Sequence, residues 1–224
     1  MPINILHSLL HRVEAGWDPI SSAHAQCYAR IASNGDPELI DRLEAMLGSL
    51  KGKSVLDLGG GPGQYSVLFA QRGASVTWHD VSREYERISR GRAEASGVAL
   101  NFSIGYLESA NKFRRNSFDL VFCRNCWWYC RSDRRFARLC YSLVKSGGVG
   151  YIDSLTPAYA KPKGFRRLQN WLNVKFCWKI GHPMAPHGRI AALIQKFPLE
   201  HLEVDYDNEC NDVVIFVKAR GPSA

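Results

Sequence analysis

The sequence lacks any run of about 20 uninterrupted apolar residues, which is the length that a membrane-spanning helix requires. Its start, MPINILHSLLHRVE, lacks the cationic segment and sustained apolar run of a secretory leader. The chain also lacks an even number of cysteines, and its seven lie in apolar contexts typical of reduced thiols. We therefore expect a soluble, cytoplasmic protein that is not exported and does not bind a membrane.

Acidic residues are absent from Ser154 to Leu199, although the whole chain of 224 residues holds 21 Asp and Glu against 29 Lys and Arg. The cations of this acid-free segment are Lys161, Lys163, Arg166, Arg167, Lys175, Lys179, Arg189 and Lys196. Such a segment raises the local concentration of anions, which include nucleic acid, membrane surfaces and acidic small substrates. A solvated surface of lysines and arginines is the alternative that needs no ligand.

Internal repeats and low-complexity tracts are missing, and 46% apolar with 22% charged residues is the composition of an ordinary globular domain. Apolar spacing predicts helices over residues 5–14, 21–31 and 37–47, followed by alternating strands and helices. The expected strands are residues 54–58, 74–80, 99–105, 117–125, 148–154, 199–207 and 212–219, and the later helices are 64–73, 83–96, 133–144 and 165–179. This alternation indicates a parallel sheet covered on both faces, whereas the short link between the last two strands requires antiparallel pairing.

A glycine-rich turn follows the first expected strand. Gly59, Gly61 and Gly63 lie between that strand and a helix, where they allow a tight turn and let a ligand approach the backbone N–H groups. The dinucleotide fingerprint would need glycine at position 64, which is Gln64, and the Gly-Lys-Ser/Thr of a P-loop is absent. The pattern present is acidic-x-Gly-x-Gly-x-Gly, which begins at Asp57.

With this motif the sequence resembles the class I S-adenosylmethionine-dependent methyltransferases, over nearly the whole span from Lys53 to Ala219. Further matches are Asp80, which closes the second strand, Gly105–Glu108, Ser117–Val121 with Asn125, and the Lys145–Gly148 turn. The resemblance implies that the glycine motif holds the methionine end of the cofactor and that Asp80 accepts hydrogen bonds from both ribose hydroxyls. Tyr106 replaces the aspartate that often contacts adenine in the family.

The resemblance implies a fold, a cofactor and a set of cofactor contacts. The fold is an α/β, Rossmann-like, doubly wound sheet of seven strands, mainly parallel with one antiparallel strand. The cofactor is S-adenosyl-L-methionine, which leaves as S-adenosyl-L-homocysteine, and no metal is expected. The implied cofactor contacts are Asp57, Gly59, Gly61, Gly63, Asp80, Val81, Leu107, Glu108 and Asn125.

We expect a single methyltransferase domain over residues 1–224. Its parts are a helical lid (1–50), a cofactor-binding core (51–153), a basic substrate-site insert (154–198) and a C-terminal β-hairpin (199–224).

Three cysteines, Cys123, Cys126 and Cys130, have the spacing C-x2-C-x3-C. Radical enzymes that use the same cofactor have the opposite order of spacings, and Cys123 lies inside an expected buried strand. A structural role in the core is therefore favoured over a metal site.

Aromatic residues follow Asn125 at the carboxyl end of the fourth strand, where open α/β sheets bind ligands. They could pack on the sulfonium or on an acceptor ring, or else serve only to pack a lid. The sequence lacks both the Asn/Asp-Pro-Pro-aromatic motif of exocyclic-amine methylation and the Pro-Cys dipeptide of cytosine-C5 methylation, so base methylation is disfavoured. The expected acceptor contacts are Trp17, Tyr28, Trp127, Trp128, His182 and Arg189.

A general base is sought among histidines, because they titrate near neutrality. His24, His182 and His187 are candidates, and we select His187, with Arg189 as a clamp for an anionic group. The predicted function is methyl transfer to O or N of a small, anionic metabolite, such as a sugar, a phospho-compound or a natural-product intermediate. The oligomeric state is left open.

Two other functions are carried as alternatives. One is an RNA-directed methyltransferase that uses the basic insert with Phe165, Trp171, Phe176 and Trp178, although these aromatics recur at helical spacing, which is typical of a packed face. The other is a non-catalytic subunit that only binds the cofactor.

Overall fold

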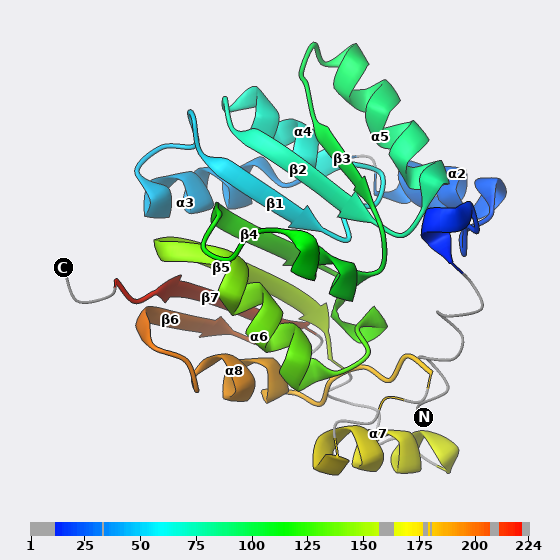
Figure 1. Cartoon of the computed structure of the whole chain (residues 1–224), viewed down its shortest axis with the longest axis vertical. Helices are drawn as coiled ribbons and strands as arrows, with labels where there is room; N and C mark the ends of the chain where they lie inside the picture. Colours follow the sequence, from blue (N-terminus) through cyan, green and yellow to red (C-terminus); the bar gives the residue numbers. More distant parts are fainter. Residues whose placement is uncertain are drawn as a thin grey trace.

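The computed structural model describes residues 12–32, 34–156, 164–176, 179, 181–206 and 211–220. Its centre is one seven-stranded sheet in the order β3-β2-β1-β4-β5-β7-β6, in which β7 alone runs antiparallel to its neighbours (Figure 1). The strands are β1 (Ser54–Leu58), β2 (Ser75–Asp80), β3 (Asn101–Ile104), β4 (Phe118–Arg124), β5 (Val144–Leu155), β6 (Leu199–Asp205) and β7 (Asn211–Lys218). The expected fold class and the closing antiparallel pair are confirmed.

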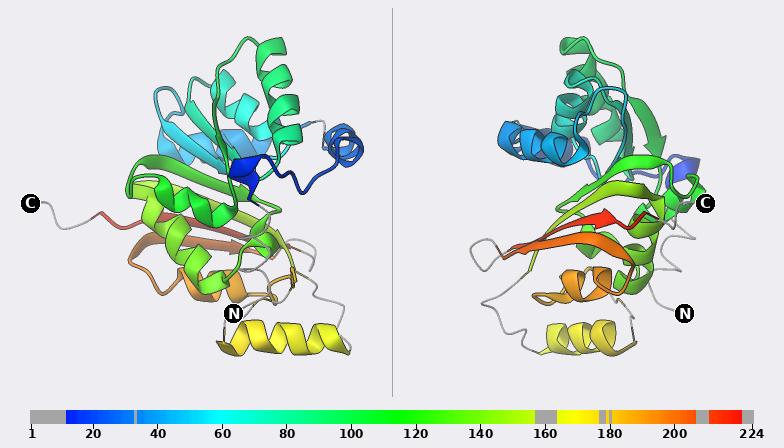
Figure 2. Two further views of the ribbon diagram at one scale, coloured as in Figure 1. Left: turned by 45° about the vertical axis from the view of Figure 1, so that its right-hand side comes forward. Right: turned by 90° about the vertical axis from the view of Figure 1, so that its left-hand side faces the viewer.

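Helices cover both faces of the sheet. They are α2 (Ser22–Ile31), α3 (Pro37–Leu47), α4 (Gln64–Gln71), α5 (Arg83–Ala95), α6 (Asp133–Leu143), α7 (Phe165–Phe176) and α8 (Arg189–Ile194), with short 3-10 turns η1 (Val13–Ala15), η2 (Leu107–Lys112) and η3 (Trp127–Tyr129). One core cluster packs α3 and α4 on the sheet, and a second packs α6 and α8 on its other face. Figure 2 shows α7 apart from both layers. No helix in the described part of the chain is both long and apolar enough to cross a membrane.

The helices before the sheet begin as their sequence predicts. Ser21 caps α2, and the Asp36 carboxylate accepts hydrogen bonds from the first N–H groups of α3. Ile40 and Leu43 of α3 are buried in the core, so this half of the expected lid is part of the sheet's packing. Only the segment through α2, which contacts α5, remains near the carboxyl edge of the sheet.

Two elements differ from the sequence prediction, and a third cannot be compared. β5 begins at Val144, which pairs with Phe118 before a register shift, so the expected turn at 145–148 lies inside this strand. The short helix α8 was not expected. Most of the helix expected over residues 5–14 lies outside the described residues.

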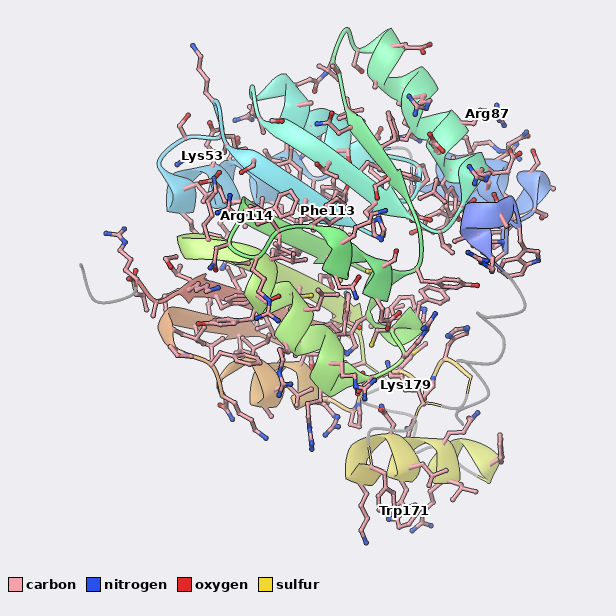
Figure 3. All side chains as sticks on the ribbon, in the orientation of Figure 1. Lys53, Arg87, Phe113, Arg114, Trp171 and Lys179 are labelled. Carbon is pink, nitrogen blue, oxygen red and sulfur yellow. The ribbon has the colours of Figure 1, made fainter. Side chains whose placement is uncertain are left out.

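The aromatic side chains of α7 do not form a packed face within this chain. Phe165, Trp171 and Phe176 are 63%, 49% and 45% exposed. Figure 3 shows Trp171 on the side of α7 that points away from the sheet. Trp178 lies outside the described residues. The expectation that these residues are buried is therefore wrong for the three that the structure describes.

Candidate functional site

The glycine loop, residues 59–63, turns at the carboxyl end of β1 and is fixed against β2. The N–H groups of Gly59 and Gly60 donate to the carbonyl of His79, and the Trp78 indole N–H donates to the carbonyl of Gly61 at 3.0 Å. Gly59, Gly61 and Gly63 all have positive φ angles. A Cβ on Gly60 would lie 2.3 Å from the Trp78 ring, so close packing also requires glycine here.

Two buried carboxylates flank this loop, as the sequence predicts. Asp80 accepts hydrogen bonds from the N–H groups of Gly61 and Ser82, both at 3.0 Å, and Asp57 accepts from the Ser66 hydroxyl at 2.6 Å. Burial raises the pKa of Asp80 to about 6, although these N–H donors oppose the shift. Burial likewise raises the pKa of Asp57 to about 7.

The lid segment, defined here as residues 12–31, is tied to the same edge. The Asp18 carboxylate accepts from the Ser82 hydroxyl at 3.1 Å and from the N–H groups of Arg83 and Glu84 at 2.7 and 3.0 Å, which caps α5 next to Asp80. Tyr28 lies beside the glycine loop, since a Cβ on Gly61 would be 4.0 Å from its ring. Trp17 is partly buried in the lid segment.

A charged pair stands where β4 and β5 end. The Arg124 Nε donates to Asp153 Oδ2 at 2.8 Å, and the guanidinium carbon lies 4.9 Å from the centre of the Tyr65 ring. Asn125 follows with a φ of 54°, and its side-chain oxygen is buried without a hydrogen-bond partner among the described residues. A strained backbone and an orphaned acceptor together mark a position suited to a ligand.

The expected adenine contacts lie beyond β2 and β3. Leu107 is buried, and Val81 directly follows Asp80 with partial burial. Glu108 accepts a hydrogen bond from the backbone N–H of Arg131, whose guanidinium lies over the Tyr106 ring. The Glu108 carboxylate is thus engaged with Arg131 in this structure.

The aromatic group after Asn125 divides between core and surface. Trp127 is fully buried, its indole N–H donates to Asp133 Oδ1 at 2.9 Å, and its ring packs on Phe136. Its assignment as an acceptor contact is therefore corrected. Trp128 is partly buried, and the exposed Tyr129 ring lies 5.1 Å from the ring of His182. Trp128 and His182 therefore remain candidates for acceptor contacts.

Asp133 joins the basic insert to the rest of the chain. One carboxylate oxygen pairs with Lys179 Nζ at 2.8 Å, and the other accepts from Asn173 Nδ2 at 2.8 Å and from Arg189 Nε at 3.2 Å. Although burial opposes ionisation, these partners hold the pKa of Asp133 below its ordinary value. Figure 3 shows Lys179 between α6 and α7. The expected role of Arg189 as an acceptor clamp is corrected, because its guanidinium anchors the insert.

His187 forms a histidine–carboxylate pair. Its Nδ1 lies 2.8 Å from Asp212 Oδ1, and its ring centre lies 4.3 Å from that of Tyr206. Asp212 is fully buried and also accepts from the N–H of Gly188 and the hydroxyl of Thr156. It pairs opposite the carboxyl end of β5, so the histidine lies at the same edge of the sheet as the glycine loop but several strands away.

The three cysteines of the C-x2-C-x3-C sequence are buried in the core. Cys123 is fully buried in β4, and its sulfur lies 3.0 Å from that of Cys126, which donates to the carbonyl of Leu58. Cys130 is buried beside Lys179. Within the described ranges, no three His, Cys, Asp or Glu side chains are grouped to hold a metal ion.

Several site residues were missed by the sequence analysis. Trp78, Ser66 and Asp18 act through hydrogen bonds to residues distant in sequence, which leave no local pattern. Arg124 and Asp153 carry a usable signal, because each is a charged residue that follows a buried apolar stretch near the carboxyl end of its strand. Such a side chain reaches the ligand-binding edge of a parallel sheet.

Comparisons with known proteins agree on the type of domain. Residues 55–148 match a family model described as a methyltransferase domain. A ubiquinone biosynthesis O-methyltransferase of Bordetella avium is 30% identical over 130 residues, which cover 58% of this chain and 53% of that protein. The chain thus spans about half the length of the curated relatives it matches.

Solved structures show the same fold at low identity. Phosphoethanolamine N-methyltransferase 2 of Haemonchus contortus, in complex with phosphomonomethylethanolamine and S-adenosylhomocysteine, superposes with a TM-score of 0.70 at 15% identity, covering 90% of this chain and 59% of that one. An O-methyltransferase family protein from Burkholderia thailandensis gives 0.63 at 18% identity, covering 88% and 59%. At these identities the likeness establishes the fold alone.

Proposed function

We propose that this chain is a class I S-adenosylmethionine-dependent methyltransferase that transfers a methyl group from the cofactor to a hydroxyl oxygen of a small, anionic substrate. The match of residues 55–148 to a methyltransferase-domain model supports this proposal. The observation that carries the proposal is Asp80, a buried carboxylate at the end of β2 that is bonded to the glycine loop. A buried carboxylate beside backbone glycines can accept hydrogen bonds from the ribose hydroxyls of a nucleoside cofactor.

Other groups along the edge also fit this cofactor. The buried side-chain oxygen of Asn125 has no partner among the described residues and can accept a hydrogen bond from an ammonium group. The lid segment, held by Asp18, lies over the glycine loop through Tyr28. S-adenosylmethionine supplies an activated methyl group, so the chain's own task is to align the acceptor and exclude water.

We assign the proton transfer to His187. The carboxylate of Asp212 accepts a hydrogen bond from the Nδ1 side of the ring, which leaves Nε2 as the basic nitrogen. A hydroxyl acceptor would pass its proton to this nitrogen as its oxygen attacks the methyl carbon. The choice of oxygen is supported by the O-methyltransferase names of the curated relatives.

The remaining acceptor contacts are assigned to Trp128, His182, Tyr28 and Trp17. They belong to the lid segment, to residues 125–129 and to the basic insert, which we propose as the walls of the acceptor site. Its excess of cations favours an anionic acceptor.

The test combines binding with turnover. Calorimetry should show that the wild-type protein binds S-adenosylhomocysteine and does not bind NAD. Isotope-labelled S-adenosylmethionine, incubated with the protein and a metabolite extract, should yield a labelled small molecule in mass spectrometry. If calorimetry detects binding of NAD but no binding of S-adenosylhomocysteine, the cofactor assignment is contradicted. If the protein binds the cofactor but transfers no methyl group, a non-catalytic subunit is favoured.

A further inference from the structure

The guanidinium group of Arg124 is held by a hydrogen bond at its Nε atom. Its Nε donates to Asp153 Oδ2 at 2.8 Å, and its plane is supported by the Tyr65 ring at 4.9 Å. The Asp153 side chain is only 3% exposed, whereas that of Arg124 is 34% exposed. The two terminal amino groups of Arg124 have no hydrogen-bond partner among the described residues. Two parallel N–H donors in a fixed orientation match the two oxygens of a carboxylate.

The surroundings place this donor pair within the proposed cofactor and acceptor site. Tyr65 follows the glycine loop by two residues at the start of α4, and Asn125 follows Arg124 directly with its orphaned oxygen. The charge of Arg124 also acts on the Tyr28 hydroxyl, where it opposes the larger effect of burial, which raises the pKa of that phenol. Arg124 is therefore close to Tyr28 of the lid segment, to Tyr65 at the start of α4 and to Asn125 after β4.

We infer that Arg124 is the receptor for a carboxylate group bound at this edge, and that Asp153 and Tyr65 position it. The inference rests on the proposed function and adds a binding residue to it. Two carboxylates could serve: the amino-acid end of the cofactor, whose ammonium would meet Asn125, or an acid group on the acceptor. The chemistry is the same in both cases, and the two sources can be separated by experiment.

The first arm of the test concerns the cofactor. Calorimetry compares S-adenosylhomocysteine with 5′-methylthioadenosine, which keeps the nucleoside and the sulfur but lacks the amino-acid group. If the cofactor supplies the carboxylate, Arg124→Met weakens binding of S-adenosylhomocysteine by ~10- to 100-fold and leaves binding of methylthioadenosine unchanged. Arg124→Lys keeps the charge without the paired donors and should give a smaller loss.

The second arm concerns the acceptor. Proteins saturated with S-adenosylhomocysteine are titrated with 4-hydroxybenzoate and with phenol, which differ by one carboxylate. If the acceptor supplies the carboxylate, Arg124→Met leaves cofactor binding unchanged and weakens 4-hydroxybenzoate ~10- to 100-fold relative to phenol.

Arg90 provides a matched control. Its guanidinium also lies over an aromatic ring, Phe102 at 4.0 Å, and its Nε also bonds a carboxylate, Glu86 at 3.0 Å, but its ring partner belongs to the edge strand β3. Arg90→Met should change neither the affinity for S-adenosylhomocysteine nor that for 4-hydroxybenzoate. Thermal unfolding of each variant shows whether it is folded. If Arg124→Met does not fold, the comparison is made with Arg124→Lys.

The outcomes separate the inference from the function beneath it. A folded Arg124→Met protein that matches wild type for S-adenosylhomocysteine and for 4-hydroxybenzoate overturns the inference alone. A wild-type protein that binds neither nucleoside overturns the proposed function, and the inference with it.

Discussion

Asp80 should make cofactor affinity depend on pH. Its ionised form is the one that accepts hydrogen bonds from ribose hydroxyls, and its pKa in the free protein is about 6. Affinity for S-adenosylhomocysteine should therefore be greatest above pH 7 and should fall as the pH drops through 6, because protons then compete with the ligand. Calorimetry from pH 5 to 8 measures this.

Substitution of the same carboxylate provides the control for that pH profile. Asp80→Ala should weaken binding by ~2–4 kcal/mol at pH 8 and remove the fall in affinity near pH 6, while Asp57, whose pKa is about 7, can still titrate. A wild-type affinity that stays constant between pH 5 and 8 would show that Asp80 does not hold the ribose.

His187 is the residue on which the chemistry should depend most. His187→Ala should lower kcat by ~10²- to 10⁴-fold, the usual contribution of a positioned base, with little change in cofactor affinity. Asp212→Asn should act in the same direction, because the ring would lose the partner that orients it. The measurement is kcat across pH 6 to 9, with His201→Ala in the exposed part of β6 as control. Near wild-type kcat in His187→Ala would mean that the base lies elsewhere.

The junction between the glycine loop and α4 depends on the size of one residue. A Cβ on Gly63 would lie 2.0 Å from the Ser89 hydroxyl oxygen and 3.1 Å from its Cα, and the φ angle is +82°. Gly63→Ala should therefore destabilise the fold by ~1–3 kcal/mol, since α5 must move. Gly91, also in α5, has open space, so Gly91→Ala should stabilise by ~0.5–1 kcal/mol. Denaturant titration compares the two, and equal effects would refute the packing argument.

The Asp133 cluster should be the main attachment of the insert to α6. Asp133 and Lys179 are both fully buried, so Asp133→Ala leaves an uncompensated ammonium and should cost ~3–5 kcal/mol of unfolding free energy. The exposed pair of Arg87 and Glu84 gives the control, since Arg87→Ala should cost under ~1 kcal/mol. If Asp133→Ala, Lys179→Met and wild type unfold at the same denaturant concentration, the cluster does not stabilise the fold.

How far the sequence predicts an element depends on where its partners lie. The helices α2 and α3 and the glycine loop depend on residues within a few positions of one another, and each was predicted close to its observed bounds. The Asp133 cluster joins residues 40 to 56 positions apart, so no local pattern indicates it. Arg189 was misassigned for the same reason. Trp127 lies only six residues from Asp133, but its burial against Phe136 depends on how α6 packs on the sheet.

At the scale of the whole molecule, alternation of strands and helices was enough to predict the sheet, because parallel pairing requires crossover helices. The position of the binding edge followed from that order, since the carboxyl ends of β1, β2 and β4 meet there (Figure 1). The acceptor could not be predicted, because the contacts that we propose for it belong to the lid segment and the insert. Their arrangement depends on contacts such as Asp18 with α5.

The net charge of +8 suggests nucleic acid as a partner, but the structure reduces the charge that is free to bind it. Lys179 and Arg189 share the carboxylate of Asp133, and Arg131 is paired with Glu108. We therefore predict weak, non-specific RNA binding that disappears as salt rises, because each phosphate contact releases condensed counterions. Fluorescence anisotropy with a hairpin and a single strand, at low and physiological salt, measures this. Sub-micromolar binding at physiological salt that distinguishes the two RNAs would instead favour an RNA-directed methyltransferase, since affinity that depends on RNA structure requires contacts beyond counterion release.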